Sequence, residues 1–212
     1  MLERVGIIDV SVGNVGSLCR ALADTGVEVR LVQERDDLKY VDGIVLPGVG
    51  AFEHGVRSLR DAGLWEGIQE AVLADSLPIL GICLGMQLLG DRSEEGIERG
   101  LGLIAGNVKH ISSLSRASQE LTIPNMGWCH VDSSSDRGRE FLDGFNGKQR
   151  FYFVHSYYFC AAQDSNVLLS VGGHPDLTAA VVDRHICGFQ FHPEKSHRFG
   201  QQALNLWVRG VL

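Results

Sequence analysis

The first half of the chain alternates short apolar runs with amphipathic stretches. Runs of strand length occur at residues 5–10, 27–32, 44–46 and 78–82. Apolar residues at three- and four-residue spacing predict helices at 13–22, 53–74 and 84–89, the second of them broken near Gly63. Strands that alternate with helices in this way predict a parallel sheet with helices on both faces.

The second half has a different pattern, in which short strand-like runs follow one another. These runs lie at residues 128–131, 151–154, 167–170, 178–182 and 186–191, and a last helix is expected at 196–208. We expect a single domain over residues 1–212 in the α/β class. Its central sheet should be mostly parallel, with helices on both faces and extra antiparallel strands from the second half. The polar stretch 133–139 is expected to be a mobile loop.

The composition is typical of a reduced, cytoplasmic, globular protein. The chain has 212 residues, 44% of them hydrophobic, which is enough for one sizeable packed domain. A formal net charge of −7, without a run of Lys or Arg, argues against nucleic acid as the partner. No apolar stretch approaches the ~20 residues that span a bilayer, and the N-terminus lacks a signal-peptide pattern. Five cysteines without a CxxC pair or an HExxH motif suggest neither a disulfide framework nor a zinc site.

The motif Gly-Ile-Cys-Leu-Gly at residues 81–85 joins a predicted strand to a predicted helix, with Cys83 at the junction. Glycines on both sides permit a cramped turn that pushes the central side chain into a cleft. The N-terminus of the following helix favours a thiolate and offers free amides to an oxyanion. A buried structural cysteine is the alternative, because free cysteines are often buried.

The motif His-Pro-Glu at residues 192–194 supplies what a cysteine nucleophile requires. In an extended backbone, His192 and Glu194 point to the same side, so the carboxylate can orient the imidazole. The alternative is a surface turn. Together with the cysteine motif, a triad of Cys83, His192 and Glu194 is the favoured interpretation.

A third motif, Pro-Gly-Val-Gly at residues 47–50, ends the predicted strand at 44–46. Two glycines allow peptide flips that other residues resist, so an amide of this segment could turn toward the cleft and complete an oxyanion hole. An ordinary tight turn is the alternative.

The residues at 81–87 and 192–194, taken together, resemble the class I (triad) glutamine amidotransferases. The segments at 46–52, 126–128, 151–157 and 189–196 are similar, more narrowly, to the glutaminase-subunit family of imidazole glycerol phosphate synthases. The resemblance implies hydrolysis of glutamine to glutamate through a thioester on cysteine. It also implies transfer of the ammonia to a (β/α)8-barrel synthase subunit in histidine biosynthesis, as a heterodimer. This chemistry needs no metal or organic cofactor.

The resemblance also implies roles for individual residues. Cys83 would be the nucleophile, His192 the general base and then acid, and Glu194 the residue that orients it. Oxyanion stabilisation is implied for the amides of Val49, Gly50 and Leu84. Substrate contacts are implied for Gly48, Gln87, Glu95, His155, Ser156 and Tyr157. Contacts with the synthase are implied for Asn14, Asn125, Met126, Trp128 and Lys195.

Two departures from the family pattern concern the synthase-facing side. A histidine commonly precedes Met-Gly-Trp and an asparagine follows it, whereas this chain has Asn125 and Cys129. An aromatic residue commonly follows Asp9, where this chain has Val10. One rival is therefore a paralogous glutaminase that feeds a sugar amidotransferase in surface-polysaccharide synthesis. Others are a non-catalytic regulatory subunit on the same fold and a free-standing cysteine hydrolase.

Overall fold

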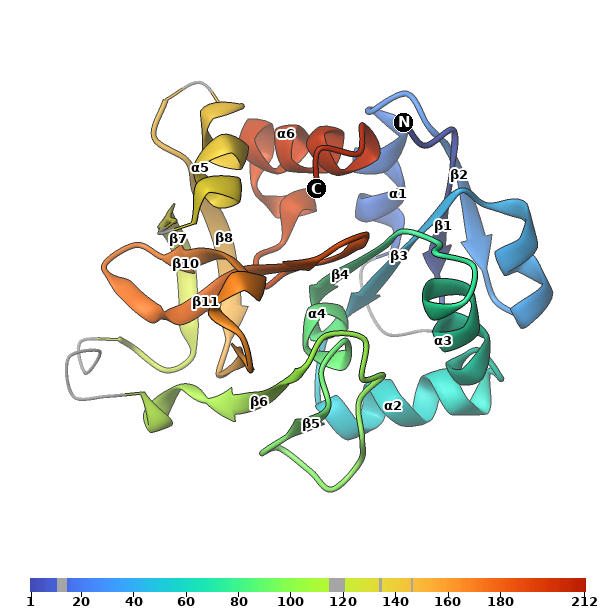
Figure 1. Cartoon of the computed structure of the whole chain (residues 1–212), viewed down its shortest axis with the longest axis horizontal. Helices are drawn as coiled ribbons and strands as arrows, with labels where there is room; N and C mark the ends of the chain where they lie inside the picture. The colour runs from blue at the N-terminus through green and yellow to red at the C-terminus, as the bar shows by residue number, and fades with distance from the viewer. Residues whose placement is uncertain (11–14, 115–120, 134, 146) are drawn as a thin grey trace.

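The computed structural model describes residues 1–212 except 11–14, 115–120, 134 and 146 (Figure 1). Nine strands of the described chain form one mixed sheet in the order β2-β1-β3-β4-β12-β11-β10-β7-β8. The parallel part consists of β2 (Glu28–Val32), β1 (Arg4–Ile8), β3 (Gly43–Gly48), β4 (Ile79–Cys83) and β12 (Ile186–Phe189). The antiparallel part consists of β11 (His174–Asp183), β10 (Val167–Val171), β7 (Asn125–Asp132) and β8 (Arg150–His155).

Helices cover both faces of this sheet (Figure 1). One face carries α1 (Val15–Ala23), α5 (Asp136–Asp143) and α6 (His197–Val208), and the other carries α2 (Phe52–Asp61), α3 (Trp65–Leu73) and α4 (Leu84–Leu88). Helix α2 shows why each helix packs as it does, because Phe52, Val56 and Leu59 recur on one side and are all fully buried. Each face therefore has its own hydrophobic core.

Smaller elements complete the fold. A three-stranded sheet consists of β5 (Arg92–Ser93), β6 (Gly106–His110) and β9 (Tyr157–Ala161). Short 3-10 helices are η1 (Arg35–Tyr40), η2 (Ile111–Ser113), η4 (Asp164–Asn166) and η5 (Pro193–Lys195). No helix in the described part of the chain is both long and apolar enough to cross a bilayer.

The α/β class, the helices on both faces and the antiparallel strands of the second half are confirmed. The break near Gly63 is also confirmed, since α2 ends at Asp61 and α3 begins at Trp65. Five of the nine strands are parallel to one another, and the antiparallel strands join the same sheet through β12.

Three expectations need correction. The strand at 44–46 continues through Pro47 to Gly48. Residues 136–139 are not a loop but the start of α5, where the Ser135 hydroxyl caps the helix by accepting from the Gly138 amide. Strands β6 and β9 were not predicted, although their five-residue pairing closes the small sheet. Residues 13 and 14, the expected start of the first helix, lie outside the described residues.

Candidate active site

Cys83 lies where β4 turns into α4, in a backbone conformation that only a few residue types adopt readily. Its φ is +55° and its ψ is −110°, a strained combination for a residue with a side chain. The flanking glycines make this turn possible. A Cβ atom on Gly85 would lie 1.7 Å from the carbonyl oxygen of Leu46, and one on Gly81 would lie 2.6 Å from the carbonyl oxygen of Gly85. The motif at 81–85 is therefore a true elbow, with the thiol at its tip.

His192 and Glu194 are paired directly. Nδ1 of His192 lies 2.9 Å from Oε1 of Glu194, and both side chains are buried. The carboxylate accepts a hydrogen bond from Nδ1–H, which leaves Nε2 to act on the thiol. The expected contact is present, but the extended backbone invoked for it is wrong. Residues Pro193–Lys195 form the 3-10 turn η5, and this turn brings the two side chains together.

The pKa of His192 is raised to about 9. Burial alone would lower it, but the hydrogen bonds and charges of Cys83 and Glu194 outweigh burial. Near neutral pH the imidazole is therefore able to hold the proton that the thiol gives up. Nε2 of His192 is buried and makes no hydrogen bond of normal geometry to the described residues, so it is available to exchange that proton with the thiol.

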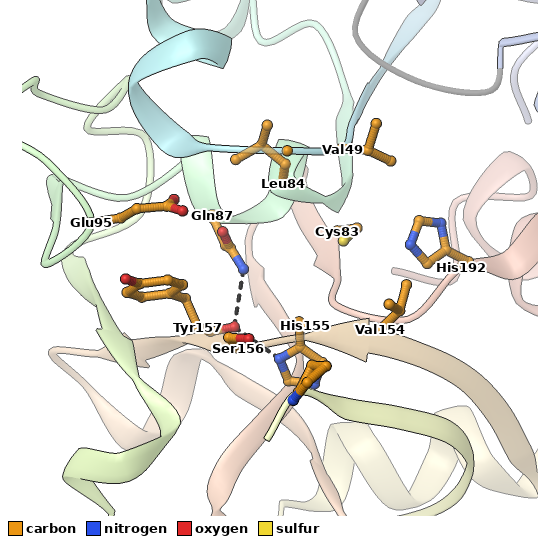
Figure 2. A pocket seen from close by; sticks show the side chains of 12 residues that line it. Val49, Cys83, Leu84, Gln87, Glu95, Val154, His155, Ser156, Tyr157 and His192 are labelled. Atoms are coloured by element: carbon orange, nitrogen blue, oxygen red, sulfur yellow. Dashed lines mark hydrogen bonds between the residues drawn. The ribbon is translucent and has the colours of Figure 1, made fainter. Parts of the chain in front are cut away.

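A pocket of about 320 Å³ opens beside the thiol (Figure 2). Most residues that the resemblance assigned to catalysis or to substrate line it: Val49, Gly50, Cys83, Leu84, Gln87, Glu95, His155, Ser156, Tyr157 and His192. Gly48 is set back from this pocket, where a Cβ atom would lie 2.9 Å from Cβ of Leu84. Segments more than a hundred residues apart thus meet at the carboxyl ends of β3, β4 and β12, as expected for a sheet of this kind.

Leu84 and Val49 lie on the same side of the pocket (Figure 2). Leu84 is the first residue of α4, where helix amides lack intrahelical partners. Gly50 has a φ of +93°, in the region that glycine adopts without strain. The arrangement can offer backbone donors to an oxygen bound above the thiol.

Two of the side chains expected to bind substrate already make hydrogen bonds within the protein. Nε2 of Gln87 donates to the Tyr157 carbonyl at 3.0 Å and to Oε1 of Gln190 at 3.1 Å. Oε2 of Glu95 accepts from the Phe52 amide at 2.7 Å. Figure 2 shows Glu95 and the Tyr157 ring across the pocket from His192. A carboxylate therefore lies at the end of the pocket away from the imidazole.

His155 is a structural rather than an acid-base group. Its Nδ1 donates to the Tyr157 carbonyl at 2.8 Å, and its Nε2 accepts from Nδ2 of Asn125 at 2.9 Å. The pKa of His155 is lowered to about 4, because burial, together with the nearby charge of His192, outweighs the hydrogen bond to the Tyr157 carbonyl. The imidazole is therefore neutral at physiological pH, as the bond from Asn125 requires.

The residues expected to face a synthase subunit are not all exposed. Met126 and Trp128 on β7 are 60% and 40% exposed, and Lys195 is exposed as well. The indole of Trp128 stacks on the ring of His197 with centroids 5.1 Å apart. Asn125 differs, because its side chain is buried against His155. Asn14 lies outside the described residues.

Gln190 is a polar contact of the thiol to which the sequence analysis gave no role. It is fully buried, and its Nε2 donates to Sγ of Cys83 at 3.7 Å. A usable signal was present, since Gln190 is a polar residue between two buried phenylalanines just before His192. Within the described residues, no group of three or more His, Cys, Asp or Glu side chains is placed to hold a metal ion.

This fold and this site define a class of protein: the chain belongs to the class I glutamine amidotransferases, whose family model matches residues 6–208. A curated relative from Pseudomonas aeruginosa, named imidazole glycerol phosphate synthase subunit HisH 2, is 40% identical over 97% of this chain and 98% of its own length. The HisH subunit of Geobacillus thermodenitrificans is also 40% identical, over 98% of this chain and 96% of its own. A crystal structure of a glutamine amidotransferase superposes with a TM-score of 0.73 at 19% identity, covering 97% of this chain and 98% of that one, which shows the shared fold.

Proposed function

We propose that this chain is the glutaminase subunit of an imidazole glycerol phosphate synthase. It hydrolyses glutamine to glutamate and passes the ammonia to a (β/α)8-barrel synthase subunit in histidine biosynthesis. The paired imidazole and carboxylate beside a thiol at a strained elbow carry the proposal. Full-length relatives at 40% identity that are named as subunits of this synthase support the pathway.

The geometry supports a two-stage acyl transfer. The Cys83 thiol gives its proton to Nε2 of His192, and the thiolate attacks the γ-carboxamide carbon of glutamine. The oxygen becomes an oxyanion, which the amides of Leu84 and Gly50 stabilise. The C–N bond then breaks, His192 returns the proton to the leaving ammonia, and a γ-glutamyl thioester remains on Cys83. A water molecule, deprotonated by His192, hydrolyses the thioester and releases glutamate.

Glu194 serves this cycle through the imidazole, because it accepts from Nδ1 and stabilises the imidazolium. Each preorganised oxyanion donor contributes about 10²–10³-fold in rate in comparable sites. Glu95, at the end of the pocket away from His192, fits the ammonium group of the glutamine head, and Ser156 and Tyr157 line the same pocket. The continuous nine-stranded sheet supports treating residues 1–212 as one glutaminase domain.

The exposed Met126 and Trp128 on β7, and the exposed Lys195 of η5, support a docking face for the barrel subunit. Asn125 and Cys129, which depart from the family pattern, favour one second candidate. In that case the same glutaminase chemistry feeds the barrel subunit of a sugar amidotransferase in surface-polysaccharide synthesis.

The test is glutamate release by the purified chain, alone and mixed with the imidazole glycerol phosphate synthase barrel subunit and its ribotide substrate. Strong stimulation by the barrel is expected. If the rate of glutamate release is the same with and without this barrel subunit, the glutaminase chemistry stands but the ammonia goes to another acceptor. The barrel subunit of the sugar amidotransferase would then be tested next. No glutamate release with either partner would contradict the proposed function.

A further inference from the structure

Gln190 combines complete burial with direct contact to the reacting sulfur atom. It directly follows β12, and its backbone amide donates to the Ala179 carbonyl at 2.9 Å. The backbone position from which the side chain extends is therefore fixed. Burying a primary amide costs free energy unless its polar atoms find partners. Here both ends do, and one of the partners is Sγ of Cys83.

The orientation of the Gln190 amide follows from its neighbours. Nε2 of Gln87 faces the Tyr157 carbonyl, which only accepts, so the Gln87 side chain must present its NH₂ group there. The same NH₂ group meets the Gln190 side chain, which must therefore present its oxygen. The NH₂ group of Gln190 is left pointing at the sulfur, 3.7 Å away. The carbonyl of Tyr157 thus sets the direction of a chain of hydrogen bonds that ends on the thiol.

We infer that Gln190 is a catalytic residue that stabilises the Cys83 thiolate by donating a hydrogen bond to it. His192 takes the proton of the thiol at Nε2, and the sulfur lone pair left behind accepts the N–H of Gln190. A hydrogen bond to an ionised acceptor is stronger than one to a neutral acceptor, so Gln190 favours the thiolate over the thiol. This inference rests on the proposed role of Cys83 as the nucleophile.

A second consequence distinguishes this role from simple packing. A thiolate that accepts a hydrogen bond forms more readily but is intrinsically less nucleophilic. Loss of the Gln190 donor should therefore slow the reaction of Cys83 where the thiolate is scarce, and should not slow it where the thiolate is fully formed. A distorted pocket would instead slow the reaction at every pH.

Several titratable groups surround the thiol and share in its pH profile. His192 adjoins Cys83 from η5, with Glu194 on the far side of its ring, and three more line the pocket from other elements: His155 on β8, Tyr157 on β9 and Glu95 just after β5. Gln190 itself does not titrate. Any displacement of the profile in a Gln190 variant therefore arises from the lost donor.

The test is the rate of Cys83 alkylation by iodoacetamide between about pH 5 and pH 10, with the Cys83→Ala chain subtracting alkylation of the other cysteines. Gln190→Met keeps the length of the side chain but lacks the donor. Gln190→Asn keeps an amide but withdraws it by one methylene. Gln69→Met is the matched control, because Gln69 on α3 gives its hydrogen bond to the Leu101 carbonyl, away from the pocket.

Both Gln190 variants are expected to react about tenfold more slowly than the native chain near neutral pH. They should reach a plateau at high pH that is equal to or above that of the native chain, and the control should follow the native curve. Profiles that superimpose on the native one, or a plateau lowered by the same factor as the neutral rate, would overturn the inference. The measurement uses neither glutamine nor a synthase, so its outcome is separate from that of the proposed function.

Discussion

The two halves of the central sheet support the site in different ways. In the parallel half, β3 and β4 are buried along their whole length and end at Gly48 and Cys83, so the thiol is held in a region with little room to move. In the antiparallel half, every second residue of β7 is exposed, Met126 and Trp128 among them, and β8 alternates buried with partly buried residues. The rigid half holds the proposed chemistry, and the half with a free face holds the proposed recognition surface.

His192 lies where the two halves meet. It follows β12 in sequence, yet its backbone amide is bonded to the Tyr152 carbonyl of β8 at 2.9 Å. The ring of Phe191 also stacks on that of Phe151, with centroids 4.0 Å apart. The antiparallel half therefore fixes the base, and the parallel half fixes the nucleophile.

The two pocket histidines show the same contrast in charge. The pKa of His192 is raised to about 9 because Cys83 and Glu194 outweigh burial, whereas the pKa of His155 is lowered to about 4 because burial dominates. Cys83 and Glu194 together make His192 a proton carrier, whereas burial keeps His155, which is hydrogen-bonded to Asn125, a neutral support.

The largest expected effect comes from the parallel half. Cys83→Ala should reduce glutamate release by about 10⁴-fold or more, because no other group can form the thioester. Synthesis by the assembled enzyme from added ammonium should continue, since the antiparallel face is untouched. Glutamate release at the native rate from the variant chain would exclude Cys83 as the nucleophile.

The next effect falls on the junction of the two halves. Glu194→Gln should lower kcat for glutamate release by about 10³-fold, because an amide cannot stabilise the imidazolium and favours the wrong tautomer. Glu98→Gln is a suitable control, since Glu98 pairs with Arg60 away from the pocket. Equal rates in the two variants would show that the His192–Glu194 contact has no part in the reaction.

A third prediction separates the two histidines by pH. The folded pKa of His155 lies below its usual 6.5, so its contribution to stability is present above pH 6.5 and is lost as the pH falls toward about 4. That contribution is on the order of 3 kcal/mol. The folded pKa of His192 lies above 6.5, so its contribution is present below pH 6.5 and is lost as the pH rises through about 9.

Urea unfolding at a series of pH values measures how the free energy of unfolding falls on the acid side (the acid limb) and on the alkaline side (the alkaline limb). His155→Gln should flatten the acid limb and leave the alkaline limb unchanged. His192→Gln should do the reverse. An acid limb that persists in His155→Gln would show that other groups cause it.

The smallest effect on the glutaminase centre should come from the exposed face. Trp128→Ala should weaken binding of the barrel subunit by about tenfold or more, because a partly exposed Trp is a frequent anchor at protein interfaces. The rate of Cys83 alkylation should not change. Calorimetric titration with the barrel subunit measures its affinity for the chain. An unchanged affinity would show that Trp128 is not part of the docking face. Leu73→Ala, at an exposed apolar position on α3, is the control.

Much of the parallel half could be predicted because its signals are local. Glycines flanking Cys83 and apolar strands of five or six residues identify the elbow and the sheet from adjacent positions alone. The antiparallel half depends on contacts between distant segments. The pairing of β6 with β9, and the helix that begins after Ser135, follow from packing that no short window displays. The orientation of the Gln190 amide likewise depends on hydrogen bonds with residues distant in the sequence. At Pro193 the chain forms a 3-10 turn, although the sequence was equally compatible with the extended backbone that we expected.

The most direct test of the central claim is covalent labelling with a diazoketone analogue of glutamine, located by mass spectrometry of the digested chain. The structure predicts one label per chain, on Cys83, and protection by excess glutamine, because the pocket brings the bound analogue to that thiol. Labelling spread over Cys19, Cys129 and Cys160, which are more exposed than Cys83, or labelling that glutamine does not prevent, would contradict the account.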